Sequence, residues 1–73
     1  MNQNEIEFAV FCIENIAQAL QKNSKEIFEL LVNESDILID YIIPCYESLH
    51  TQSKQYIMDD IVDVMKSKGV IAC

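Results

Sequence analysis

The chain has 73 residues, which allows one domain with a small core, because a chain of this length buries only about 60 % of its unfolded surface. Twelve acidic residues against five lysines give a formal net charge of −7, which argues against nucleic-acid binding, since phosphate contacts require a basic face. Although 51 % of the residues are hydrophobic, no stretch reaches the roughly 18–20 apolar residues of a membrane span.

The first predicted helix covers about residues 4–21. Its apolar residues recur at intervals of three and four, which is typical of one side of a helix. They are Ile6, Ala9, Ile13, Ile16 and Leu20, with Phe8, Val10, Cys12 and Ala17 beside them. Phe11 departs from the pattern, because on a helix it falls among Glu7, Glu14 and Gln18. We expect another helix to cover Phe11; the alternative is an exposed aromatic residue that binds a partner.

The second and third predicted helices cover residues 24–33 and 36–43. Asn23 or Ser24 can cap the second helix, and Asn23 with Glu26 three residues later suits a capping box in its Asn form. Ser35 or Asp36 begins the third helix, which is apolar nearly all round apart from Asp36 and Asp40. Such a segment is expected at the centre of the fold.

A break is predicted at Pro44, which has no N–H and disfavours helical geometry at the residue before it. A short helix over 44–49 follows, and the pattern leaves open whether residues 36–50 form one kinked helix or two. The last helix covers 54–68, with Ser53 as N-cap and Gly69 as terminator. Residues 1–73 are therefore predicted to form a single all-α domain, a compact bundle of three to four helices with a proline bend near Pro44.

The cysteines indicate a reducing compartment. Cys12, Cys45 and Cys73 are an odd number with no paired spacing, so free thiols are the simpler expectation. The glutamates that precede the first apolar run have the wrong charge for a secretory signal peptide. We expect a soluble, cytoplasmic protein.

Candidate chemistry is concentrated in residues 41–52, which hold Cys45 and the single histidine, His50. A thiolate–imidazolium pair requires the two side chains within hydrogen-bond reach, and a spacing of five across a helix end does not ensure it. One histidine and three scattered cysteines also fall short of the four ligands of a structural zinc site. We expect no enzyme, no catalytic residue, no metal and no cofactor.

The helix pair within residues 24–43 allows a helix-turn-helix reading. Its second helix, however, brings Asp36 and Asp40 and no base, which would repel phosphate. A transcriptional regulator therefore stays the alternative function rather than the first choice.

Three segments carry a resemblance to a known family: "EIEFAVFCIENIA", "DYIIPCYESLHTQ" and "YIMDDIVDVMKSKG". Together they resemble, over about residues 6–69, small bacterial proteins known only as a domain of unknown function. Members of that family are often encoded beside a protein similar to ADP-ribosyltransferases. The resemblance implies an accessory or antitoxin-like partner of a neighbouring enzyme, and it supplies no catalytic residue.

These observations favour a small non-enzymatic protein-interaction module. Its partner is expected to be a protein, such as an adjacent-gene product, with a homodimer as a further form of the same prediction. The surface would combine acidic residues with an apolar anchor, and no membrane is involved. The candidate interaction residues are Phe11, Tyr41, Tyr46 and His50.

Overall fold

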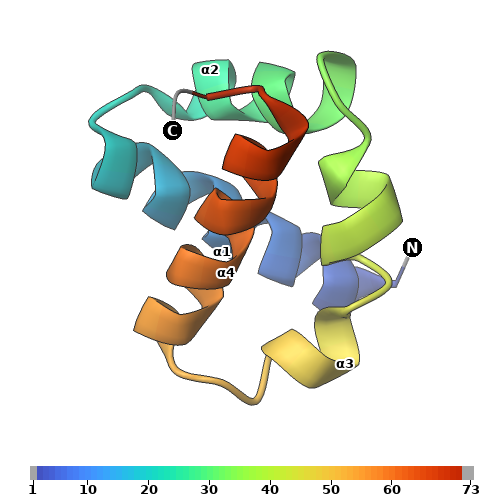
Figure 1. Cartoon of the computed structure of the whole chain (residues 1–73). Coiled ribbons are helices and arrows are strands. Elements are labelled where there is room, and N and C mark those ends of the chain that lie inside the picture. The colour runs from blue at the N-terminus through green and yellow to red at the C-terminus, as the bar shows by residue number, and fades with distance from the viewer. Residues whose placement is uncertain (1, 72–73) are drawn as a thin grey trace.

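The computed structural model describes residues 2–71, and it contains helices and turns but no strand in that range (Figure 1). In chain order the elements are α1 (Gln3–Leu20), α2 (Ser24–Phe28), the π-helix η1 (Glu29–Asn33), the π-helix η2 (Leu38–Ile42), α3 (Tyr46–Leu49) and α4 (Lys54–Lys68). The all-α prediction is confirmed. Cys73, whose state the sequence left open, lies outside the described residues.

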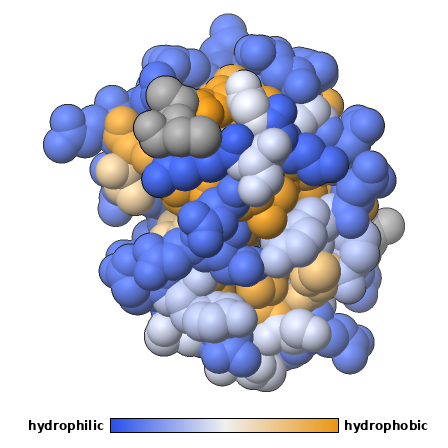
Figure 2. Space-filling model, in the orientation of Figure 1, coloured by the Kyte–Doolittle hydropathy of each residue, from blue (hydrophilic) through white to orange (hydrophobic). Residues whose placement is uncertain are grey.

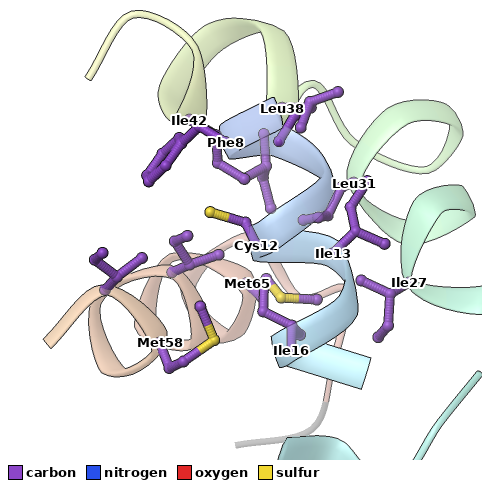
Figure 3. Close-up of a cluster of buried hydrophobic side chains, with 14 of the residues drawn as sticks. Phe8, Cys12, Ile13, Ile16, Ile27, Leu31, Leu38, Ile42, Met58 and Met65 are labelled. Atoms are coloured by element: carbon purple, nitrogen blue, oxygen red, sulfur yellow. The ribbon is translucent and has the colours of Figure 1, made fainter. Parts of the chain in front are cut away.

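The core forms where α1 meets the helices around it. α1 packs against α2 and against α4, and η1 packs against η2. Figure 3 shows side chains of α1 pointing toward Met58 and Met65 of α4 on one side and toward Ile27 and Leu31 on the other. The fully buried side chains are Cys12, Ile16, Ile27, Leu31, Ile37, Ile42, Ile61 and Met65. Among residues 2–71 no charged or polar residue is buried, so the interior is held by apolar packing alone.

The surface around this core is largely hydrophilic. In the view of Figure 1, α4 crosses in front of α1, and Figure 2 shows hydrophilic side chains over much of that face with apolar ones visible between them. No helix within residues 2–71 is both long and apolar enough to cross a membrane.

Local capping explains where α1 begins and ends. The Asn2 side chain accepts from the Glu5 N–H at 2.8 Å, and the Glu5 carboxylate accepts from the Asn2 N–H at 3.0 Å. This capping box was not predicted, although its Asn-x-x-Glu spacing is visible in the sequence. At the other end Gln21 takes the left-handed conformation (φ 57°), and the Lys22 N–H donates to the Ala17 carbonyl at 2.9 Å. These bonds make a Schellman motif without glycine.

The predicted apolar side of α1 is wrong at its edge. Ile6 is 49 % exposed and Val10 is 48 % exposed, although both belong to the predicted apolar side. Phe11 is 38 % exposed, so the expectation that another helix covers it is also wrong. The reason is tertiary: α2 and α4 pack against α1 but leave the arc with Ile6, Val10 and Phe11 uncovered, and a helical period cannot say how wide the covered part is.

The chain from 24 to 33 is helical as predicted but changes type. Asn23 caps α2 by accepting from the Glu26 N–H at 2.7 Å. The reciprocal half of the predicted capping box is absent, because the Glu26 carboxylate pairs with Lys22 at 3.2 Å instead. After Phe28 the turns widen into η1, and the Glu34 N–H donates to the Glu29 carbonyl five residues back.

The segment around Pro44 settles the question of one kinked helix or two. η2 ends at Ile42, residues 43–45 form a turn, and α3 follows as a separate helix. Ile43 keeps helical backbone angles (φ −68°, ψ −48°), although Pro44 was expected to disfavour them. Because the Ile43 N–H donates to Leu38 five residues back, the wide turn closes before the proline. Pro44 lies ahead of α3, whose N-cap is Cys45, rather than in its first turn.

The bounds of α4 are as predicted. Ser53 accepts from the Tyr56 N–H at 3.1 Å, and Gly69 ends the helix in the left-handed conformation (φ 77°). Val70 then folds back, and its N–H donates to the Met65 carbonyl at 3.1 Å. Both signals are local, which is why the sequence could place them.

Candidate functional site

Three of the four predicted interaction residues come together in one row of rings. Phe11 stacks on Phe8 with ring centroids 6.2 Å apart, and Phe8 and Tyr46 form a T-shaped pair with ring centroids 5.3 Å apart. Tyr46 in turn stacks on His50 at 4.5 Å. This aromatic row joins the N-terminal half of α1 to α3. Its end at Phe11 is exposed, so the row both packs the two helices and reaches the surface.

His50 is held by Tyr46 rather than by a catalytic partner. Its Nδ1 lies 2.8 Å from the Tyr46 carbonyl oxygen, in addition to the ring stacking. Cys45 is the N-cap of α3 and His50 is its C-cap, so the two stand at opposite ends of one helix. Within residues 2–71 no hydrogen bond joins them. The geometry gives no support to a nucleophilic pair, and the absence of catalysis stays a prediction.

Tyr41 does not join the aromatic row. Its hydroxyl donates to a carboxylate oxygen of Asp60, which ties η2 to α4. The hydrogen bond to Asp60, with some burial, raises the pKa of Tyr41 to about 12. Its position fits a structural tie better than a docking anchor.

Two hollows lie away from the row. One, of about 360 Å³, is lined by Glu34, Ser35, Asp36, Ile37, Asp40, Tyr41, Val64 and Lys68. The other, of about 470 Å³, is an open notch between α1 and α4 lined by Asn15, Gln18, Ala19, Lys54, Gln55 and Met58. Neither contains the histidine or a cysteine.

The thiols within the described residues are inert or partly covered. Cys12 lies fully inside the core, and burial raises the pKa of its thiol to about 12. Cys45 is half-buried and free. Across residues 2–71 no group of three His, Cys, Asp or Glu side chains is placed to hold a metal ion.

α1 carries a mixed apolar and acidic surface, of which the sequence predicted Phe11 among Glu7 and Glu14 but not the exposure of Ile6 and Val10. We call it the α1 outer face and define it by Ile6, Glu7, Val10, Phe11 and Glu14, all of them exposed. No lysine lies in α1, so the carboxylates of this face have no cation on their own helix. Only Phe11 gave a signal in the sequence, because it alone broke the amphipathic pattern.

Over residues 2–71 the fold and this surface define a small all-helical domain. The chain belongs to the family described as "Protein of unknown function (DUF3791)", whose model matches residues 7–68. That match takes in nearly all of α1 and everything through the end of α4, so the family is defined by the whole helical domain. No curated protein and no solved structure matches the chain.

Proposed function

We propose that this protein is a non-enzymatic protein-interaction module whose partner docks on the α1 outer face. The observation that carries the proposal is the exposure of Ile6, Val10 and Phe11, each by more than a third, on a helix whose other side is buried. Apolar side chains gathered on one face and bordered by polar ones are typical of interaction sites. Aromatic residues such as Phe11 are also enriched in interfaces.

The charge favours a protein over a nucleic acid as the partner. The chain carries −7, and the middle segment expected to act as a recognition helix is the five-residue η2, preceded by Asp36 and containing Asp40. Phosphate would be repelled there. The alternative, a helix-turn-helix regulator, therefore has no observation in its favour.

The partner class follows from the resemblance described above. We propose an accessory or antitoxin-like role in which this domain binds an enzyme encoded nearby, in the cytoplasm. An interaction module of this kind needs no catalytic residue, in keeping with the separation of Cys45 and His50. A standard interface buries roughly 1,600 Å² in total. For a domain with 4602 Å² of accessible surface, one half of such an interface is a substantial share.

The test is affinity capture from a lysate of the source organism with tagged wild type, Phe11→Ser and Tyr56→Ser. Tyr56 is a matched control, since it is an exposed aromatic residue (53 %) on α4. A partner that wild type and Tyr56→Ser retain and Phe11→Ser loses supports the proposal. Circular dichroism must show that all three are folded. Equal profiles for the three proteins, or no partner at all, would overturn it.

A further inference from the structure

We infer that the α1 outer face takes a basic amphipathic helix, with Lys or Arg beside its apolar side chains. This inference rests on the proposed function and adds the chemistry of the partner. Ile6 and Val10 lie one helical turn apart, and Glu14 continues the line from Val10. The face is therefore about 12 Å long, which suits roughly two turns of a partner helix.

The order of side chains around α1 decides what the partner must carry. At 3.6 residues per turn, Glu7 and Glu14 fall between Val10 on one side and Phe11 on the other. A partner that covers both apolar edges must also remove water from the two carboxylates. A buried carboxylate is costly unless a cation or hydrogen-bond donors replace the lost water. The partner is therefore expected to bring cations to the middle of its apolar face.

The two carboxylates are available for such pairing. Glu14 makes no hydrogen bond or ion pair within residues 2–71, and Glu7 accepts only from the neutral amide of Gln3, at 3.1 Å. The one ion pair among the described residues joins Lys22 and Glu26, beyond the end of this face. Lys and Arg give short, charge-assisted hydrogen bonds to carboxylates, so they suit these positions.

A second copy of this chain fits the same face poorly. Face-to-face packing of two copies would bring Glu7 and Glu14 of one against those of the other, without a lysine to separate them. Two chains of −7 also repel each other at long range. Charge complementarity therefore selects a basic partner over self-association.

The probe is a 14-residue amphipathic helical peptide of Leu and Lys, beside the same peptide with Glu in place of Lys. Each is titrated into the isotopically labelled protein by NMR and by calorimetry at low and high salt. The Leu–Lys peptide should shift the amide signals of residues 6–14, with weaker binding at high salt. The Leu–Glu peptide should not bind.

Two double variants distinguish the effect of the α1 outer face on peptide binding from the effect of net charge. One variant combines Glu7→Lys with Glu14→Lys, and the other combines Asp59→Lys with Asp63→Lys. Each changes the net charge from −7 by +4, to −3, and all four positions are exposed. The α1 double variant should weaken binding of the Leu–Lys peptide by about tenfold or more, and the α4 double variant should weaken it by about threefold or less.

Equal losses in the two double variants, shifts centred outside α1, or no binding would overturn the inference. So would equal binding of the Leu–Glu peptide, or self-association through residues 6–14 in sedimentation. The proposed function is tested separately. If a native partner is lost on Phe11→Ser but the Leu–Lys peptide does not bind, the interaction module stands and the basic partner helix is refuted.

Discussion

Gln21 and Gly69 end their helices with the same motif, and the difference between them gives a sharp prediction. Both residues take the left-handed conformation, and in both cases the next N–H folds back to a carbonyl five residues earlier. Gln21 pays a steric cost there that glycine does not, because its Cβ approaches the following carbonyl oxygen. Gln21→Gly is therefore expected to stabilise the fold.

The magnitude combines two opposing terms. Relief of the left-handed strain is worth roughly 1–2 kcal/mol, and the added freedom of the unfolded chain at glycine takes back about 0.5–1 kcal/mol. The Gln21 side chain is exposed, so its loss removes little packing. The net gain should be about 0–1.5 kcal/mol, with a midpoint of about 0.75 kcal/mol that corresponds to roughly 3–6 °C in Tm for a domain of this size.

Gly69→Ala is the matched reverse substitution. A Cβ at Gly69 would meet nothing within 4 Å, so the expected loss of about 1 kcal/mol is purely conformational. Urea unfolding followed at 222 nm gives both values, with the slope of the free energy against urea unchanged. A destabilised Gln21→Gly or a neutral Gly69→Ala would refute the argument, because the two sites would then not be governed by the left-handed backbone.

Three further predictions concern the buried Cys12 thiol and two side-chain hydrogen bonds. The Cys12 thiol stays neutral in the fold up to a pKa of about 12 but ionises near pH 9 when unfolded. Its contribution to stability is therefore complete below pH 9 and is lost toward pH 12, at about 1.4 kcal/mol per unit. Free energies of unfolding from urea titrations should change little up to about pH 9 and fall toward that slope by pH 10.5 in wild type, and fall less in Cys12→Ala. Ser35→Ala should cost about 1 kcal/mol in the same assay, because the hydroxyl donates to the Leu30 carbonyl at 2.7 Å; no loss would mean that water replaces it. Tyr41→Phe should also cost about 1 kcal/mol, and in an Asp60→Ala background it should cost nothing more if the Tyr41–Asp60 bond is the cause.

The parts of the fold that the sequence predicted are those set by neighbouring residues. Ser53 and Gly69 fix the ends of α4 through hydrogen bonds within four or five residues, so residue types alone locate them. The π-helices escaped prediction because η1 and η2 differ from an α-helix by one residue per hydrogen-bonded turn, while their apolar residues still recur every three or four positions. Packing, not spacing, decides between the two.

In the candidate site, too, the sequence predicted what neighbouring residues determine and missed what packing between helices determines. Phe11 stood out because a single helix suffices to place it among glutamates. Its stacking partner Phe8 and the link through Tyr46 depend on α1 and α3 meeting in space, which no local pattern encodes. The exposure of Ile6 and Val10 was not predicted, because a helical wheel shows which residues share a side but not how much of that side a neighbour covers.

The exposure of Ile6 and Val10 has an energetic meaning for a domain with so small a core. Full burial of a Val or Ile side chain is worth about 1.5–3 kcal/mol, so two side chains left half exposed keep roughly that much hydrophobic free energy outside the fold. The core does not need them, since Ile13, Ile16 and Cys12 already fill the inner side of α1. Glutamates beside them keep the same surface hydrated and make self-association through it unfavourable. A basic partner helix would bury the exposed apolar edges of this face, and its cations would neutralise the carboxylates between them.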